Sequence, residues 1–284
     1  KELPRSAKPK DALIARVRGR AASGTQRLAG LLLAFQAQPG LVRWPCLRHG
    51  IPIMSTSIPP PNRERMYGDD IFREQRAQEG SWATRMNLEY PGLSILHEDP
   101  RIFEVKDFLA DDDIEQLIRL ASPQMEQSLA AGGKVDTRRT STTAFLAKYE
   151  AEWLLDKVHA LTNKPISHME PPQVGHYKPD EYFASHNDAV DMTTENGKVF
   201  FDTGGNRLVT VLIYLNSLKK GGCTRFDGLG LEIQPEKGKA VIFFPATMDA
   251  KLDPRLFHQA VPPGGDAEKW VSQIWIREGA ARPW

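Results

Sequence analysis

The chain has 284 residues, 40% of them hydrophobic, and a formal net charge of +1 at neutral pH. A chain of this length can bury a sizeable core, which suits one large domain or one domain with appendages. The small net charge gives no general case for nucleic-acid binding. The longest apolar stretch is Leu28–Phe35, which is far shorter than the roughly 20 residues of a membrane helix. Two cysteines cannot form a disulfide framework.

The charge is uneven along the chain. Residues 1–53 contain ten Lys or Arg and only two acidic residues, while the remainder is mildly acidic. An Arg-rich, acid-poor leader is typical of a transit peptide, and its patch Leu28–Phe35 also suits the core of a signal peptide. A third interpretation is that residues 1–53 are not native protein, because Met54 opens a plausible start. We expect residues 1–53 to be poorly ordered. The compartment of this soluble protein stays open, with an organelle or the endoplasmic reticulum expected if the leader is genuine.

Residues 54–92 are predicted to form a linker or arm. The run Pro59-Pro60-Pro61 breaks regular structure, and the following stretch is mostly charged. A short helix is expected within it, over Asp69–Gln78.

Residues 93–168 are predicted to be largely helical. A short strand is expected at Ile102–Val105. Acidic residues followed by apolar residues at helical spacing predict an amphipathic helix from Asp111 to Ala121. Leu154, Val158 and Leu161 indicate a second helix over Glu150–Thr162.

From about Pro171 the pattern changes to short strands separated by glycine-rich turns. The expected strands are Leu208–Leu215, Leu231–Gln234, Ala240–Phe244 and Trp270–Arg277. Many short strands with glycine turns indicate an all-β sandwich or barrel, here preceded by helices, so the expected fold class is α+β.

The most informative pattern is His186-Asn187-Asp188. Side chains at i and i+2 of a strand point to the same face, so the imidazole and the carboxylate can share one metal. A third ligand must come from another strand, and His258 precedes the last one. Two histidines and one carboxylate leave open positions on iron(II), whereas a four-ligand zinc site would not. The other histidines are interpreted as surface or core residues: His49, His97, His159, His168 and His176.

Lys269 adds a second element, because it opens the last predicted strand eleven positions after His258. A buried strand that begins with Lys needs an anionic partner, since an unpaired buried charge is costly. The distal carboxylate of 2-oxoglutarate is a partner of that kind. The alternative is a Lys at a strand edge with its ammonium in water, which is common. Because Lys269 follows His258 closely in the sequence, we favour the interpretation that it binds 2-oxoglutarate.

His-x-Asp alone is weak evidence, but it stands within a series of motifs that resembles the catalytic domain of the prolyl 4-hydroxylases, a family of the iron and 2-oxoglutarate oxygenase superfamily. The resemblance covers most of Ile102–Arg277 and none of residues 1–53. It is carried by Met169–Val174, Tyr177, His186–Asp188, Gly204–Asn216, Gly221-Gly222, Thr224, Phe226, Pro235–Phe244, Asp253, Leu256, His258, Lys269-Trp270 and Trp275–Arg277, and more weakly by Phe108-Leu109, Arg139–Ser141 and Glu152-Trp153.

The resemblance implies a double-stranded β-helix (jelly-roll) core in a dioxygenase domain of residues 169–280, with helices of residues 93–168 packed against it. It also implies Fe(2+), 2-oxoglutarate as co-substrate, L-ascorbate, dioxygen and a proline-containing protein or peptide substrate. No nucleic-acid partner and no membrane span are expected.

The resemblance also assigns residues. It implies His186, Asp188 and His258 as the iron ligands and catalytic residues, and Lys269 as the partner of the 2-oxoglutarate carboxylate. By position, Tyr177 and Thr210 look like further hydrogen-bonding contacts to the co-substrate. For Thr210 a plain strand residue is an equally good interpretation, and Trp270 and Trp275 are expected in the core.

Some positions depart from the family pattern. Cys223 stands where the family usually has Glu, Phe183 where it often has a Tyr near the substrate proline, and Gln259-Ala260 follows the second histidine. Two long polar segments, Ala130–Thr143 and the inserted Val190–Thr203, are expected to be either a mobile lid or plain surface loops.

Three hypotheses follow for the function. The first is a peptidyl-proline 4-hydroxylase. The second is a related oxygenase that hydroxylates another side chain or a small molecule. The third is a non-enzymatic binding module on the same barrel, which would predict missing ligands, although all three metal ligands and Lys269 are present.

Overall fold

The computed structural model describes residues 86–130, 134–135 and 137–282. The predicted leader, most of the predicted linker and the short helix expected over Asp69–Gln78 lie outside these residues. The described helices are α2 (Asp111–Ala121), α3 (Glu152–Thr162) and α4 (Glu195–Asp202). None of the helices in these ranges is long and apolar enough to cross a membrane.

The strands are short and almost all lie C-terminal to the first helix. They are β1 (Leu93–His97), β2 (Ile102–Val105), β3 (Glu126–Gln127), β4 (Leu129–Ala130), β5 (Lys134–Val135), β6 (Thr142–Phe145), β7 (Gln173–Tyr177), β8 (Phe183–His186), β9 (Arg207–Tyr214), β10 (Thr224–Phe226), β11 (Leu231–Ile233), β12 (Ala240–Phe243), β13 (His258–Ala260) and β14 (Lys269–Arg277).

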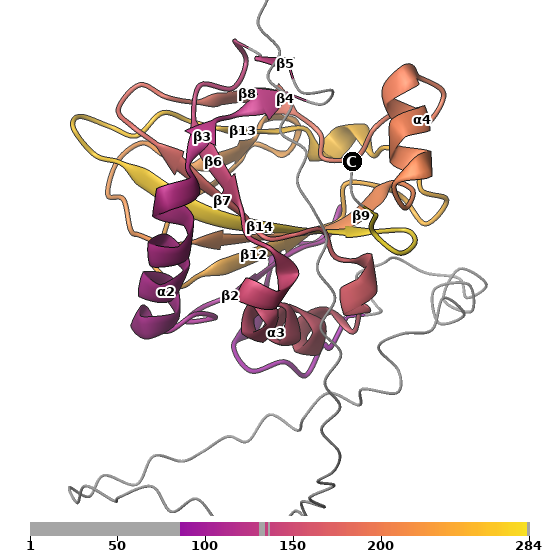
Figure 1. Cartoon of the computed structure of the whole chain (residues 1–284), viewed down its shortest axis with the longest axis horizontal. Helices are drawn as coiled ribbons and strands as arrows, with labels where there is room; N and C mark the ends of the chain where they lie inside the picture. Colours follow the sequence, from indigo (N-terminus) through magenta and orange to yellow (C-terminus); the bar gives the residue numbers. More distant parts are fainter. Residues whose placement is uncertain (1–85, 131–133, 136, 283–284) are drawn as a thin grey trace, which may run out of the picture. The chain divides into compact units, whose positions relative to one another are not determined.

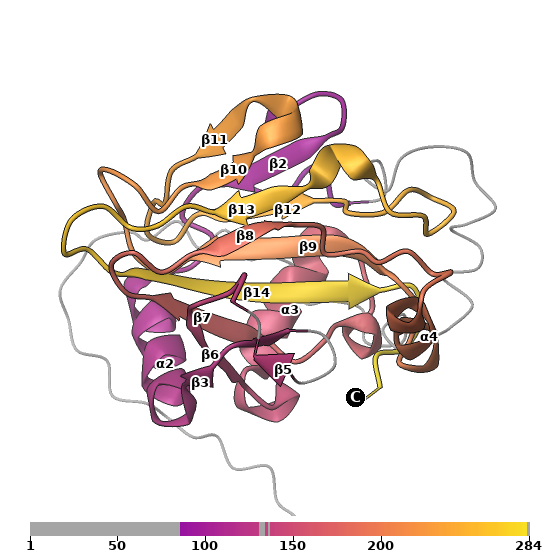
Figure 2. The same cartoon turned by 90° about the horizontal axis from the view of Figure 1, so that it is seen from above.

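Two antiparallel sheets form the core of the fold. The larger has the strand order β1-β2-β12-β9-β14-β7-β6-β3, and the smaller has the order β11-β10-β13-β8. The smaller sheet lies over one face of the larger, while α2 and α3 cover the other face (Figures 1 and 2). In both sheets most neighbouring strands are not consecutive in the chain, as in the expected jelly-roll core with helices packed against it.

The alternation of strand β9 divides the interior into two apolar regions. Val209, Val211 and Ile213 belong to the cluster that packs with the helices, whereas Leu212 and Tyr214 belong to the cluster between the two sheets. Because side chains alternate along a strand, one continuous apolar run can serve both faces of a buried sheet. The functional side chains described below lie on the second face.

The helices form as their sequences predict. In α2, three aspartates occupy the first turn, where the helix dipole favours negative charge, and Asp113 accepts a hydrogen bond from the backbone N–H of Ala110. The apolar positions Ile114, Leu117 and Ala121 are buried against the core. Helix α2 confirms the predicted bounds, and α3 begins two residues later than expected because a 3-10 turn occupies Lys148–Glu150.

The two segments considered as lids are more regular than expected. The insertion Val190–Thr203 contains α4, whose first turn is capped by the Thr194 hydroxyl as it accepts a hydrogen bond from the N–H of Gly197. Residues 137–141 of the second segment run beside β8, where the N–H of Ala184 donates to the carbonyl of Arg138. A plain loop is therefore wrong for the insertion, and a lid function for either segment stays a prediction.

Candidate active site

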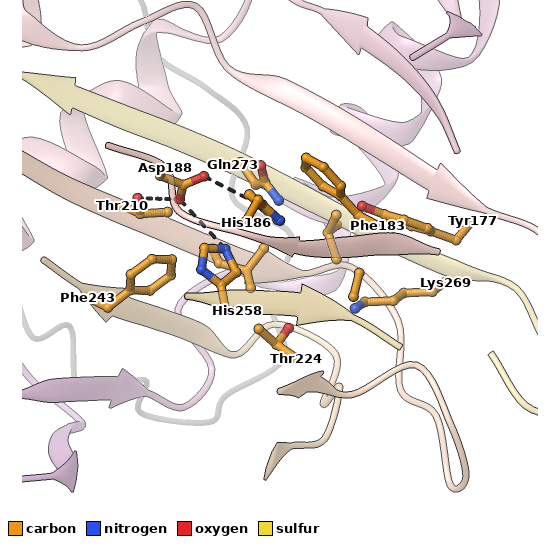
Figure 3. Close-up of a pocket in the computed structure, with 13 residues that line it drawn as sticks. Tyr177, Phe183, His186, Asp188, Thr210, Thr224, Phe243, His258, Lys269 and Gln273 are labelled. Carbon is orange, nitrogen blue, oxygen red and sulfur yellow. Dashed lines mark hydrogen bonds and ion pairs between the residues drawn. The ribbon is translucent and has the colours of Figure 1, made fainter. Parts of the chain in front are cut away.

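Three side chains from two distant segments of the sequence meet between the two sheets (Figure 3). Strand β8 ends at His186 and strand β13 begins at His258, and the antiparallel pairing of these strands places the two residues opposite each other. Asp188 lies beside both, and one ligand atom from each side chain lies within 4.8 Å of the others. The structure therefore brings together the three residues that the sequence predicts as metal ligands.

The local geometry of Asp188 differs from the prediction. Alternation along one strand was expected to align His186 with Asp188, but β8 ends at His186, and Asp188 lies in the bend that follows. This turn brings Asp188 Oδ1 to 3.6 Å from His186 Nε2, and Oδ2 to 3.9 Å from His258 Nε2. Both distances exceed a good hydrogen bond, so the three groups surround a space instead of closing on each other.

Both imidazoles are oriented by backbone carbonyls. His186 Nδ1 lies 2.9 Å from the carbonyl oxygen of Ala184, and His258 Nδ1 lies 3.0 Å from that of Leu256. A carbonyl can only accept, so each Nδ1 carries the hydrogen and each Nε2 lone pair faces Asp188. Burial, together with the neighbouring His258, lowers the pKa of His186 to about 3, which keeps this imidazole neutral. Neutral imidazoles fixed in this tautomer are the form that binds metals.

Asp188 is buried but stays ionised. Burial acts to raise its pKa, yet the facing imidazoles, Arg207 and a hydrogen bond from Thr210 outweigh it, so that the pKa of the carboxyl lies below its usual value. The Thr210 hydroxyl donates to Asp188 Oδ2 at 2.7 Å. Two imidazoles and one carboxylate make a donor set that suits iron(II) and leaves positions open.

The other end of the pocket holds Lys269, the first residue of β14. Its side chain is only 1% exposed, and burial lowers the pKa of its ammonium to about 7. Among the described residues no carboxylate forms an ion pair with it; its Nζ instead lies 5.5 Å from the ring centre of Tyr177 and 5.7 Å from that of Tyr214. The buried strand that begins with Lys is therefore as predicted, and its cation can serve an incoming anion.

The structure places the two other predicted contacts in the same pocket. Tyr177 is opposite Lys269 in the pairing of β7 with β14, and its ring lies against the pocket. Thr210 also lines the pocket, although its hydroxyl is engaged with Asp188. The remaining lining residues are Phe183, Leu212, Thr224, Phe243, Ala260, Val271 and Gln273.

Sequence reasoning missed a stack of three side chains at the pocket wall. The Phe183 ring lies parallel to His186, with 3.6 Å between ring centres, and the Arg139 guanidinium lies 4.8 Å from the Phe183 ring centre. Arg139 is itself buried and donates to Gln173 Oε1 at 2.8 Å. Both residues stand in motifs noted in the sequence, but their contact depends on the pairing of the 137–141 segment with β8, which spacing does not reveal.

The other described histidines have structural partners, as expected. A ring nitrogen of each contacts the carbonyl of Pro100 (His97), Lys164 (His159) or Arg277 (His168), or the Glu268 carboxylate (His176). Trp275 is buried and Trp270 packs against the core, also as expected.

A comparison with known protein families matches the region that contains this site. Residues 172–277, which contain all six predicted site residues, match the 2OG-Fe(II) oxygenase superfamily. A probable prolyl 4-hydroxylase 10 of Arabidopsis thaliana is 31% identical over 218 residues, covering 65% of this chain and 71% of the relative. A putative prolyl 4-hydroxylase of Acanthamoeba polyphaga mimivirus is 27% identical over 186 residues, covering 64% of this chain and 76% of the relative.

A solved structure is also similar. The viral collagen prolyl hydroxylase of Paramecium bursaria Chlorella virus-1, determined as a 2OG complex, aligns with a TM-score of 0.48 and 23% sequence identity, over 62% of this chain and 94% of that one. With the matched superfamily region and relatives at 30% identity or more, the chain belongs to the prolyl 4-hydroxylase family of the 2OG-Fe(II) oxygenases.

Proposed function

We propose that the chain is a dioxygenase that uses Fe(2+) and 2-oxoglutarate to hydroxylate proline in a protein or peptide. Family membership supports the reaction class. The relatives named as prolyl 4-hydroxylases support the substrate. The observation that carries the proposal is the meeting of His186, Asp188 and His258 in one pocket with the buried cation of Lys269.

At the metal end, His186, Asp188 and His258 would hold the iron through two Nε2 atoms and one carboxylate oxygen. The carbonyls of Ala184 and Leu256 keep the lone pairs of both Nε2 atoms directed at this point. Iron with 2-oxoglutarate supplies the activation of dioxygen, while the protein orients the reactants and excludes side reactions. Three protein ligands would leave the other positions of the iron for the co-substrate and dioxygen.

At the opposite end, the Lys269 ammonium would bind the distal carboxylate of 2-oxoglutarate. A charge-assisted hydrogen bond in a buried pocket is among the stronger polar contacts that a protein makes. Tyr177 would add a further contact through its hydroxyl. We assign Thr210 to the co-substrate as well, and its bond to Asp188 gives it a second role at the metal.

The domain assignment follows the same proposal. Residues 169–280 would form the dioxygenase domain, because they supply the smaller sheet and the strands of the larger sheet that line the pocket. Residues 93–168 would support it through α2, α3 and the outer strands of the larger sheet. L-Ascorbate would serve as the reductant that maintains ferrous iron during turnover.

Mass spectrometry of peptide products tests the function. Proline-rich peptides are incubated with the protein, Fe(2+), ascorbate and 2-oxoglutarate, and a gain of one oxygen on proline is expected. The same peptides with each proline replaced by alanine provide the matched control. Phe183 occupies the position where the family often has Tyr, so peptides with other residues and small molecules form the second arm. If only this second arm gains oxygen, the substrate is another residue or a small molecule and not proline.

A further inference from the structure

The loop that carries Asp188 is held by two asparagine side chains that have no part in the chemistry proposed above. Asn187 stands between the two ligands of the first motif, and Asn206 directly precedes β9. Asn206 is fully buried and Asn187 is partly buried. A buried side-chain amide must use its donors and acceptor, so the partners of these two groups report what they hold in place.

Asn187 joins the two segments that supply the metal ligands. Its Nδ2 donates to the carbonyl of Asp253 at 2.7 Å, and its Oδ1 accepts from the N–H of Ala189 at 2.8 Å. Asp253 lies five residues before His258 in the chain, and it caps the single 3-10 turn that leads into β13. The amide therefore connects the bend around Asp188 to the approach of His258.

Asn206 makes a second connection between the same two segments. Its Nδ2 donates to the carbonyls of Val190 and Ala250, both at 2.9 Å, and its Oδ1 accepts from the N–H of Val190 at 3.0 Å. The two amides thus join residues 189–190 to residues 250–253 at two points. Asn206 also leads into the strand of Thr210, whose hydroxyl holds Asp188 directly.

We propose that Asn187 and Asn206 are positioning residues that form an amide clamp, which sets the position of Asp188 relative to His258 and thereby the shape of the metal site. The clamp rests on the proposed metal site, but not on the identity of the substrate. Without the clamp, neither amide would tie the bend at Asp188 to residues 250–253. The Asp188 carboxylate could then shift relative to the His258 imidazole. Groups that orient metal ligands typically affect metal affinity by about 10- to 100-fold.

The chemistry of the bridge requires an amide at position 187. An aspartate there would keep the bond from the Ala189 N–H, but its second oxygen would face the carbonyl oxygen of Asp253, and two acceptors cannot share a hydrogen. It would also place a second negative charge next to Asp188. Asn187→Asp is therefore a sharp variant, because it changes little besides the donor and the charge.

Asn87 provides a matched control far from the pocket. Its Nδ2 donates to the carbonyl of Ala160 at 3.1 Å, 73 residues away, and its Oδ1 accepts from the N–H two residues on, Glu89, at 3.2 Å. This is the same pair of bonds that Asn187 makes, without a metal ligand beside it. Asn87→Ala therefore reports the cost of losing such a bridge for stability alone.

The test uses Co(2+) as a spectroscopic probe of the full chain. Calorimetric titration gives the Co(2+) affinity, visible absorption reports the ligand geometry, and thermal unfolding of the metal-free protein gives the stability of each variant. We expect Asn187→Ala and Asn187→Asp to weaken Co(2+) binding roughly 10-fold or more and to change the absorption spectrum. Asn87→Ala should lose about as much thermal stability as Asn187→Ala. It should keep the Co(2+) affinity and the absorption spectrum of the unchanged protein.

Wild-type affinity and an unchanged spectrum in both Asn187 variants would overturn the clamp. If Asn187→Ala does not fold, the same measurements on Asn187→Asp decide. An unchanged protein that binds Co(2+) but oxidises no peptide or small molecule would remove the proposed function and leave the clamp standing. An unchanged protein that binds no Co(2+) would remove the clamp together with the metal site.

Discussion

The two ends of the pocket handle burial of polar groups in opposite ways. At the metal end, His186 and His258 donate to backbone carbonyls, and Asp188 accepts from Thr210, so that the protein already orients each group. At the other end, Lys269 is equally buried, yet no carboxylate in the described part of the chain pairs with its charge. The protein itself orients the groups at the metal end, whereas the charge of Lys269 can be paired by a bound anion.

This difference predicts how each end of the pocket affects folding stability and ligand binding. An isolated buried charge destabilises the folded state, and a ligand that pairs with it restores part of that loss on binding. The Lys269 end should therefore oppose stability and favour the co-substrate. The metal end should instead show its organisation in metal affinity and catalysis.

Removal of a metal ligand should have the largest effect. Asp188→Ala or His186→Ala is expected to lower 2-oxoglutarate turnover by roughly three orders of magnitude or more, while the protein stays folded. Decarboxylation of 2-oxoglutarate and circular dichroism measure the two quantities. Substantial turnover in a folded Asp188→Ala variant would show that the carboxylate does not hold the metal.

Replacement of Lys269 should separate affinity from stability. Lys269→Met keeps the length of the side chain and removes the charge, so we expect the KM for 2-oxoglutarate to rise by roughly 10- to 100-fold, with a smaller change in kcat. The ligand-free variant should unfold at a higher temperature, because the unpaired charge is gone. Unchanged co-substrate affinity would refute the assigned role of Lys269.

The pH dependence of stability should also reflect the burial of the Lys269 ammonium. The pKa of Lys269 is about 7 in the folded protein, against about 10.4 in an unfolded chain. Between these values the unfolded chain holds the proton and the folded chain does not, so the free energy of unfolding gains a contribution that rises with pH. Denaturant unfolding at about pH 7 and about pH 10 measures it. The rise should be larger in the unchanged protein than in Lys269→Met, and an equal rise in both would contradict the expectation.

Two smaller changes should show to which end Thr210 belongs. Thr210→Val removes the hydrogen bond to Asp188 and should weaken Co(2+) binding about 10-fold. Tyr177→Phe should leave Co(2+) binding unchanged and raise the KM for 2-oxoglutarate a few-fold, as for loss of one hydrogen bond of about 1 kcal/mol. Titration of both variants with each ligand makes the comparison. A Thr210→Val variant with intact metal affinity would place its hydroxyl at the co-substrate alone.

Much of the fold is predictable from the sequence because its signals are local. The helix Asp111–Ala121 and the strands around Leu208–Leu215 and Trp270–Arg277 follow from periodicity and burial, and the structure confirms them within a residue or two. Helix α4 escapes prediction because its short segment has exposed apolar residues, Val199 and Phe201, that do not repeat at a clear helical spacing.

The site is predictable in its residues but not in its geometry. Motif order alone identifies His186, Asp188 and His258, whereas the bend that carries Asp188 depends on bonds from Asn187 and Asn206 to residues far along the chain. Contacts of this kind have no signature in spacing, because sheet pairing decides them. The same holds for the stack of Arg139 on Phe183.

A crystal structure of the protein with Mn(2+) and 2-oxoglutarate, grown without oxygen, would test the central claim most directly. The account predicts one metal ion bound by His186, Asp188 and His258, with the co-substrate on its open side and its distal carboxylate against the Lys269 ammonium. A metal ion bound elsewhere, or a 2-oxoglutarate whose distal carboxylate lies away from Lys269, would contradict it.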